Sequence, residues 1–255
     1  ERLVLAQRRI QARLSPALDS LASELGTEIE RLMRAGPQGL RIWASHGFAV
    51  QALHEAMARE GVPHELKYCS SAEALEALAG GQCDVAGFHL PLGEHEAATV
   101  AHYRRWLDPR SQRVIRLATR RQGLMTAPGN PRKIYEVADL ARPGIRFINR
   151  QAGSGTRFLL DQLLRARGLA PASYAGYEQC EYAHAAVAAF VASGMADVGM
   201  GLEPPARQFR LEFVPLQTER YMLLCRADRT DAPAVQQAIG ILRGEPFHRA
   251  IDALA

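Results

Sequence analysis

Lysine is nearly absent from this sequence, and arginine carries the positive charge. Lys67 and Lys133 are the only lysines among 31 basic residues, and the formal net charge is +4 with a pI of about 9.0. A basic balance permits contact with nucleic acid. The densest basic stretch runs from Arg104 to Arg121, but no RNP, zinc-finger or recognition-helix pattern accompanies it. We interpret this stretch as a solvated face, with a phosphate-contacting surface as the alternative.

Cysteine is also scarce, and long hydrophobic runs are missing. Cys69, Cys83, Cys180 and Cys225 form no CxxC or CxxH pattern, which argues against a disulfide framework and against a zinc site. The longest apolar runs, such as residues 183–193, stop well short of the ~18 residues that a membrane-spanning helix needs. No targeting segment is recognisable. We therefore predict a reduced, cytoplasmic protein without a membrane segment, metal or cofactor.

Aromatic residues make up only 7% of the chain, too few for the stacking platform of a single-strand nucleic-acid binder. We expect Trp43 and Trp106 to lie in the core. The composition is otherwise ordinary, because 47% hydrophobic and 23% charged residues are typical of a folded globular protein. A chain of 255 residues exceeds one typical domain of ~150 residues and falls short of two. This length predicts one two-lobed unit or a domain with an appendage.

The first 35 residues carry an apolar stripe at helical spacing. Because proline lacks an amide donor, Ser15-Pro16 predicts either one kinked helix or two helices, the second beginning at Ser15. A helix that opens the chain with no capping residue before Glu1 is typical of a fragment of a longer protein. We expect the stripe to form the seam of a homodimer or higher homo-oligomer; the alternative is packing against the body of the same chain. The stripe consists of Leu3, Ile10, Leu14, Leu18, Leu21, Leu25, Ile29 and Leu32.

From Leu40 onward, short apolar strands alternate with amphipathic helices, and the pattern occurs twice. This βαβ rhythm predicts two doubly wound α/β halves, each with a parallel sheet. The expected strands are residues 40–45, 64–69 and 83–90 in the first half, and 145–150, 173–178 and 196–202 in the second; the expected helices are 48–60, 72–78, 156–167 and 183–192.

Two long extended stretches, residues 113–131 and 212–229, separate the halves from each other and from two last helices at 234–243 and 247–254. We predict two Rossmann-like lobes joined by two crossing strands, with a ligand cleft between them. The expected organisation is residues 1–35 as a linker and dimerisation helix, 40–121 with 217–255 as lobe I, and 122–216 as lobe II.

Polar residues follow the strands at the ends where such sheets bind ligands. In open α/β sheets, ligands bind beyond the carboxyl ends of the strands, where helix amino termini present free amide donors. Ser45-His46-Gly47, Ser70-Ser71 and Gly87-Phe88-His89 hold these positions in the first half, and residues 149–157 do so in the second.

The segment Gly153-Ser154-Gly155-Thr156-Arg157 is the sharpest local signal. Two glycines allow a close backbone approach, a hydroxyl can cap the helix, and the helix dipole favours negative charge. The segment predicts an anion as guest. It matches neither the P-loop nor GxGxxG. Simple capping of the helix is the alternative.

Several motifs, in order and spanning Leu40 to about Leu224, are similar to the periplasmic-binding-protein-like (type 2) domain related to molybdate-binding proteins. The most specific is FINRQAGSGTRFLLD at 147–161. The others are ASH at 44–46, AGFHL at 86–90, RQGL at 121–124, GNP at 129–131, HAAVA at 184–188 and ADVGMG at 196–201.

This resemblance implies a sensor rather than an enzyme. In that family the domain occurs alone or behind a winged helix-turn-helix of the ModE or LysR kind, and Glu1-Arg2-Leu3 resembles the start of the linker helix that follows such a head. The resemblance implies the effector-sensing domain of a transcriptional regulator, whose DNA contacts come only through a head absent from this chain. The expected effector is a small anion, either a molybdate- or tungstate-like oxyanion or a small carboxylate such as formate.

The resemblance also implies a set of ligand contacts. Where relatives tend to have glycines after the second strand, this chain has Cys69-Ser70-Ser71, and residues 201–205 place an acid and two prolines where small residues are more usual. The expected ligand-binding residues are Ser45, His46, Ser70, Ser71, His89, Arg150, Ser154, Gly155, Thr156, Tyr182, His184 and Glu203.

Two other groups of residues have the residue types of known sites but not their spacing. His89, His95 and His102 are spaced six and seven apart, which does not place them on one helical face, so we interpret them as surface histidines and not metal ligands. Ser154, His184 and Asp197 are triad residue types, but the GxSxG elbow is absent. The alternatives that remain are a transport-type anion-binding protein and a small enzyme using His46 or His89 as base.

Overall fold

The computed structural model describes residues 2–33, 39–170 and 175–252. Its residue contacts divide the chain into two compact units. Unit 1 comprises Glu1–Ala17 and Arg120–Thr218, and unit 2 comprises Leu18–Thr119 and Glu219–Ala255. Residues 1, 34–38, 171–174 and 253–255 lie outside the described residues, and with them the ends of the predicted helices 1–35 and 247–254 and the start of the predicted strand 173–178.

The chain begins with one long helix, α1 (Arg2–Met33), and Pro16 lies inside it. The structure therefore has no second helix beginning at Ser15. A proline inside a helix removes only its own hydrogen bond and one it obstructs, and the other turns of this 32-residue helix are retained.

Unit 2 is built on parallel strands at one edge of its sheet, followed by antiparallel ones. β1 (Leu40–Ala44) pairs in parallel with β2 (His64–Tyr68) and with β3 (Val85–Pro91). The final part of β8 (Glu212–Arg226) runs antiparallel to β3, with His89 opposite Tyr221. The helices are α2 (Phe48–Arg59), α3 (Ser71–Ala79), α4 (Glu96–Tyr103), α8 (Pro233–Arg243) and α9 (Glu245–Asp252), with 3-10 turns at Arg104–Trp106 and Ala227–Arg229.

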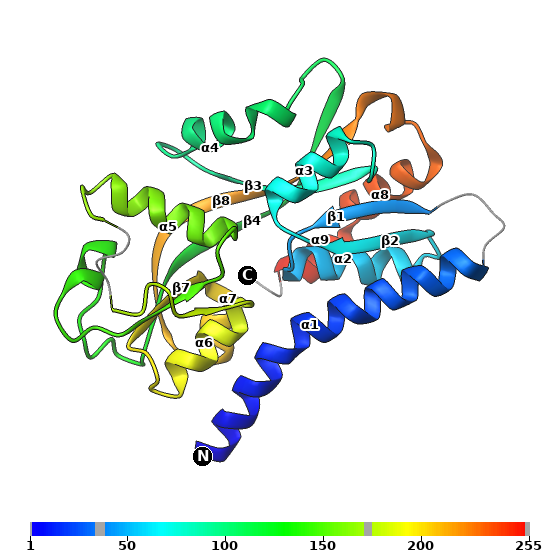
Figure 1. Ribbon diagram of the computed structural model, residues 1–255. Helices are drawn as coiled ribbons and strands as arrows, with labels where there is room; N and C mark the ends of the chain where they lie inside the picture. The colour runs from blue at the N-terminus through cyan, green and yellow to red at the C-terminus, as the bar shows by residue number, and fades with distance from the viewer. Residues whose placement is uncertain (1, 34–38, 171–174, 253–255) are drawn as a thin grey trace. The chain divides into compact units, whose positions relative to one another are not determined.

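The sheet of unit 2 separates two hydrophobic cores, because alternate residues of a strand point to opposite faces. Leu40, Ile42 and Ala44 of β1 join the core under α2, α8 and α9, whereas Trp43 packs toward the core under α3 and the segment after α4. Figure 1 shows α3 on one face of these strands and α2, α8 and α9 on the other. Trp106 belongs to the second core.

Unit 1 repeats this arrangement. β5 (Phe147–Arg150) pairs in parallel with β6 (Cys180–Glu181) and β7 (Val198–Leu202), and β7 runs antiparallel to β4 (Gln112–Thr126). Phe147 faces a core with α5 (Gly155–Arg165) and the 3-10 turn Val137–Ala141, and Ile148 faces a core with α6 (His184–Ala192) and α7 (Glu203–Gln208).

The strand order is one hydrogen-bonded series, β2-β1-β3-β8-β4-β7-β5-β6. The two long strands β4 and β8 occupy its middle, and the boundary between the units falls within each of them. The predicted α/β fold class with two lobes, each built on parallel strands, is confirmed.

One predicted strand is wrong. Residues 175–178 form a turn, and the strand is the two-residue β6. Gly176 has a φ of +93°, and a Cβ there would lie 2.0 Å from the carbonyl oxygen of Phe147. The backbone therefore bends tightly against β5, which an extended segment cannot do. The helices α4 and α7 were not expected from the sequence.

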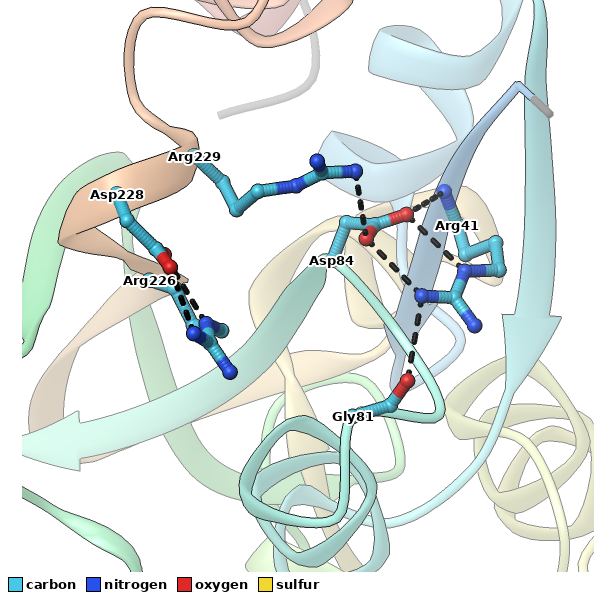
Figure 2. A network of polar contacts seen from close by, with 6 residues as sticks. All are labelled: Arg41, Gly81, Asp84, Arg226, Asp228 and Arg229. Carbon is cyan, nitrogen blue, oxygen red and sulfur yellow. Dashed lines mark hydrogen bonds and ion pairs between the residues drawn. The ribbon is translucent and has the colours of Figure 1, made fainter. Parts of the chain in front are cut away.

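An arginine–aspartate pair anchors the amino-terminal edge of the strands in each unit. In unit 2, Arg41 donates from Nε and Nη2 to the Asp84 carboxylate at 3.1 and 3.0 Å, and Arg229 lies 3.8 Å from the same carboxylate (Figure 2). Burial opposes ionisation of Asp84, but its contacts with Arg41 outweigh this effect and lower its pKa. In unit 1, Arg146 and Asp197 form the equivalent pair.

Among the described residues, no helix combines the length and apolar character that crossing a bilayer requires.

Candidate functional site

Ser45, at the carboxyl end of β1, lies in a compact polar cluster in unit 2. Its Oγ lies 2.6 Å from Nε2 of His89 and 3.1 Å from the Tyr221 hydroxyl, so its single hydrogen can be donated to only one of these two groups at a time. The Tyr221 hydroxyl donates to the Ser45 carbonyl, also at 3.1 Å. Nδ1 of His89 lies 3.6 Å from Oε1 of Glu219, and the side chains of His89 and Glu219 are both buried. The three strands β1, β3 and β8 thus bring one hydroxyl, one imidazole and one carboxylate together.

Gly87 makes room for this cluster. A Cβ at Gly87 would lie 2.7 Å from the Tyr221 hydroxyl and 2.9 Å from Cβ of Ala44. Because real Cβ atoms do not approach other atoms so closely, any side chain at this position would push Tyr221 away from Ser45. The small residue on β3 is therefore a condition for the contact between β8 and the end of β1.

The helix that follows Ser45 has no side-chain cap. Gly47 is the N-cap residue of α2, and it has no side chain that could accept a hydrogen bond from the first turn. The first N–H groups of a helix have no acceptor within it, and the helix dipole places partial positive charge there. His46 lies in this loop, with Nε2 3.6 Å from Asp19 of α1 and its ring 4.8 Å from that of Tyr68.

The predicted ligand contacts Ser70 and Ser71 lie at the start of α3. Ser70 caps α3 by accepting from the Glu73 amide, and the Glu73 carboxylate accepts from the Ser70 amide, which completes a capping box. Ser71 is buried at the first position of α3. The structure therefore uses Ser70 to close the helix terminus.

In unit 1, Arg150 is a buried cation at the carboxyl end of β5. Only 6% of it is exposed. Its Nε donates to Oε1 of Gln151 at 3.1 Å, and its Nη2 donates to the carbonyl oxygen of Tyr182 at 3.1 Å. Nη1 has no hydrogen-bond partner among the residues that the structure describes. Burial, together with the charge of Arg120, lowers the pKa of Arg150 to about 9, so it remains a cation near neutral pH.

The Gly153–Arg157 segment forms the start of α5. Gly153 has a φ of +82°, and Ser154 is the N-cap, accepting from the Arg157 amide at 3.2 Å. Gly155 and Thr156 begin the helix, where amide donors lack helical acceptors. The Arg157 guanidinium lies over the Tyr177 ring at 3.7 Å and also donates to the Arg150 carbonyl. The start of α5 thus combines a cap by Ser154 with the amides of Gly155 and Thr156, which have no acceptor within the helix.

The remaining predicted residues of unit 1 lie at helix starts or on the surface. His184 is the first residue of α6, and its Nδ1 would be 3.2 Å from a Cβ at Gly201. Tyr182 is 65% exposed. Glu203 begins α7 and contacts two arginines, Arg207 at 2.7 Å and Arg121 at 2.5 Å. A carboxylate neutralised in this way does not repel an anion as a free one would.

The interpretation of His89 and His95 as surface histidines is wrong. Their side chains are buried, His89 against Ser45 and Tyr221, and His95 with Nε2 3.2 Å from Glu94. A histidine is amphipathic enough to be buried where polar partners are supplied. Among the residues that the structure describes, no group of three or more histidine, cysteine or acidic side chains is placed to hold a metal ion.

Sequence analysis did not identify Glu219 and Tyr221. They alternate on β8 and so point to one face of it, which is the pattern that would have indicated a shared role. This pattern does not indicate which strand pairs with β8. The β3–β8 register places Tyr221 beside His89.

A pocket of about 260 Å³ in unit 2 is formed by α2, α8 and α9 and includes no residue of the cluster around Ser45. It is lined by Ala52, Ala56, Arg59, Glu60, Gly240, Ile241, Gly244, Pro246, Phe247 and Ala250.

Comparison with known proteins gives the family. Residues 53–243 match the PBP superfamily domain. The YvgK protein of Bacillus subtilis (strain 168) is 37% identical over 155 residues, which are 61% of this chain and 50% of YvgK. This chain thus spans about half the length of that curated relative.

Three solved structures share the fold at low sequence identity. An ABC-type phosphate transport receptor from Vibrio cholerae is 15% identical with a TM-score of 0.60, covering 85% of this chain and 98% of the receptor. The effector binding domain of a BenM variant is 15% identical with a TM-score of 0.57, covering 85% and 97%. An OxyR mutant of Corynebacterium glutamicum is 14% identical with a TM-score of 0.56, covering 94% and 75%. Together with the strand order and the repeated βαβ units, the family match shows that this chain belongs to the PBP superfamily.

Proposed function

We propose that this chain is the effector-sensing domain of a transcriptional regulator and that its effector is a small anion. The observation that carries the proposal is Arg150: a buried guanidinium that forms no ion pair with a described carboxylate and leaves Nη1 without a partner. Burying an unpaired charge is costly unless something compensates it. A negatively charged ligand supplies that compensation.

Two sets of groups support an anion as the ligand. In unit 1, the amide donors of Gly155 and Thr156 begin an 11-residue helix shortly after Arg150. In unit 2, Ser45 and His46 precede α2, whose first turn has no side-chain cap. Hydroxyls, amides and helix termini are the groups that bind oxyanions without needing a proton from them. The candidates are molybdate, tungstate, sulfate, phosphate and formate.

The role as a regulator is favoured by the extent of one structural match. The OxyR mutant covers 94% of this 255-residue chain, so the matched region must include part of the 32-residue α1. The match to the effector binding domain of the BenM variant covers 97% of that domain. We propose that a winged helix-turn-helix precedes α1 in the complete gene product and that the protein acts in the cytoplasm without catalysing a reaction.

A transport-type binding protein is the second candidate. This candidate is supported by the match to the Vibrio cholerae receptor, which covers 98% of the receptor with a TM-score of 0.60. The complete gene separates the two: a winged helix-turn-helix upstream supports the regulator, and a secretion signal upstream supports the transport protein.

The anion proposal is tested by thermal shift and calorimetry with the five anions named above. A ligand that binds only the native state stabilises it by RT ln(1 + [L]/Kd), about 2.7 kcal/mol at 100 times Kd. We expect at least one anion to raise the Tm of the wild type. Arg150→Met should weaken that binding about tenfold to a hundredfold, since a hydrogen bond to a charged group contributes ~1.5 to 3 kcal/mol. Ser45→Ala and Thr156→Ala should each weaken it about tenfold.

Arg165→Met is the matched control, because it makes the same change at an exposed position of α5. It should leave the anion affinity unchanged. Circular dichroism of each variant checks that it is folded. If no anion in the panel stabilises the wild type, the proposed function is wrong; if Arg150→Met binds the best anion as tightly as the wild type, Arg150 is not its contact.

A further inference from the structure

Glu219, His89 and Ser45 form a linear chain of three polar groups in unit 2. The carboxylate of Glu219 lies 3.6 Å from Nδ1 of His89, and Nε2 on the other side of the ring lies 2.6 Å from Oγ of Ser45. His89 and Glu219 are 5% and 2% exposed, whereas Ser45 is only partly buried. The chain therefore runs from a buried acid to a hydroxyl that a ligand can reach.

At 3.6 Å from Nδ1, the Glu219 carboxylate acts on neutral His89 through its charge and not through a hydrogen bond. A carboxylate beside Nδ1 favours the tautomer with hydrogen on Nδ1, because that hydrogen points toward the negative charge. Nε2 of the neutral ring is then an acceptor. At 2.6 Å its partner is the Ser45 hydroxyl, which has a single hydrogen to give. In this state Ser45 donates to His89 and offers a ligand only lone pairs.

Protonation of His89 reverses the polarity of Ser45. Imidazolium donates from both nitrogens, so Nε2 now donates to Oγ of Ser45. The hydroxyl hydrogen is released, and it can be donated to the Tyr221 hydroxyl 3.1 Å away or to an oxygen of a bound anion. The imidazolium also adds positive charge close to the anion, balanced by Glu219.

We propose that the Glu219–His89–Ser45 chain links anion binding to the uptake of one proton by His89. The link deepens the proposed function and rests on it: the anion binds tightly to the state in which Ser45 is a donor. Lower pH strengthens binding, and the gain is lost as pH rises through the pKa of His89. The site thereby reads anion concentration and pH together.

The groups around His89 agree with this role. β8 supplies Glu219 and Tyr221, whose ring centroid lies 4.0 Å from that of His89. From the end of β1 come Ser45 and the following His46, which contacts Asp19. α4 supplies Tyr103, whose pKa is raised mainly by burial and also by the charge of Glu219. Glu219 is thus the carboxylate that faces the ring directly.

The proton is measured by isothermal titration calorimetry of the wild-type chain in buffers of different ionisation enthalpy. The titrants are molybdate, sulfate and formate, which exchange no proton with water near neutral pH. The slope of binding enthalpy against buffer ionisation enthalpy gives the number of protons taken up. We expect about one proton per anion at a pH above the pKa of His89, and an affinity that falls about tenfold per pH unit there.

Two variants separate the chain from other proton sources. His89→Gln places an amide donor where protonated Nε2 would be, so we expect it to retain anion binding but to take up no proton and to lose the pH dependence. Ser45→Ala should bind about tenfold more weakly and also lose the proton uptake. His95→Asn is the control: His95 is another buried histidine beside a carboxylate in the same unit, and its loss should leave the proton count unchanged.

The outcomes are distinct. Anion binding without proton uptake in the wild type overturns the inference and leaves the proposed function standing. Proton uptake that persists in His89→Gln overturns it as well, because the proton then binds elsewhere. Failure of every anion to bind the wild type overturns the proposed function itself, and the inference with it.

Discussion

His54 of α2 and His64 of β2 form a hydrogen-bonded pair within unit 2. Nδ1 of His54 lies 2.7 Å from Nε2 of His64, and Nδ1 of His64 lies 2.8 Å from the carbonyl oxygen of Val62, to which it donates. Because this fixes the hydrogen of neutral His64 on Nδ1, its Nε2 accepts from His54. Burial, and secondarily the charge of His64, lowers the pKa of His54 below its ordinary 6.5. The folded protein therefore resists protonation of His54.

This pair predicts a loss of stability on mild acidification. Below pH 6.5 the unfolded chain takes up a proton at His54 before the folded chain does, so the free energy of unfolding falls as pH falls through the window between the two pKa values. His54→Gln should remove this part of the pH dependence. Urea unfolding at neutral pH and at about pH 5.5 measures it.

The control for this experiment is His248→Gln, at an exposed position of α9. It should retain the acid sensitivity of the wild type. An equal loss of stability on acidification in His54→Gln and in the wild type would show that the pair contributes nothing to it.

At the scale of elements, α1 presents apolar side chains to water along most of its length. Leu14, Leu18, Leu21, Leu25 and Ile29 are between 46% and 63% exposed, and their spacing places them on one side of the helix. The side chain of Leu32, which sequence analysis added to this stripe, lies outside the described residues. Burying a leucine fully contributes ~1.5 to 3 kcal/mol. We propose that the stripe binds α1 of a second copy.

The stripe predicts a dimer that charge can dissociate. Leu21→Glu combined with Leu25→Glu should shift the mass measured by light scattering from dimer to monomer, because two carboxylates would be buried in the seam. Ser23→Glu, on the opposite side of a 3.6-residue helix, should leave the mass unchanged. A wild type that is monomeric, or a double variant that stays dimeric, would show that α1 is not the seam.

At the scale of the molecule, each unit has its own cores, but the units share two strands. The boundary between the units lies at Thr119 and Arg120 in β4 and at Thr218 and Glu219 in β8. If one unit unfolds, β4 and β8 lose their hydrogen bonds there, and the parts of these strands in the other unit lose their continuation. We expect the chain to unfold as one cooperative system.

Tryptophan fluorescence tests this cooperativity, since Trp43 and Trp106 both belong to unit 2. Leu160→Ala leaves a cavity in unit 1, where Leu160 is fully buried, and should cost ~2 to 5 kcal/mol. If unfolding is cooperative, the fluorescence midpoint shifts together with the far-UV circular dichroism midpoint. Leu53→Ala, which leaves a cavity in unit 2, is the matched reference. A fluorescence midpoint that stays at the wild-type value in Leu160→Ala would show independent units.

The sequence by itself determined the fold class and the start of α5. Alternating short apolar strands and amphipathic helices indicated both parallel sheets, because a strand buried on two faces and a helix buried on one must differ in their hydrophobic period. Ser154 and the glycines around it indicated the start of α5, because capping is a local hydrogen bond between neighbours in sequence. Ser70, which the sequence analysis assigns to the ligand set, forms a capping box with Glu73 that the sequence analysis does not predict.

Only the tertiary structure decided which polar residues meet. Ser45, His89 and Tyr221 are far apart in sequence, and the register of β3 against β8 brings them within hydrogen-bond distance. The burial of His89 depends on β8, which pairs with β3. The turn at Gly176 depends on β5, because it lies against the backbone of Phe147. Local patterns report what a residue's neighbours in sequence require, whereas contacts across a sheet depend on which strands become neighbours in space.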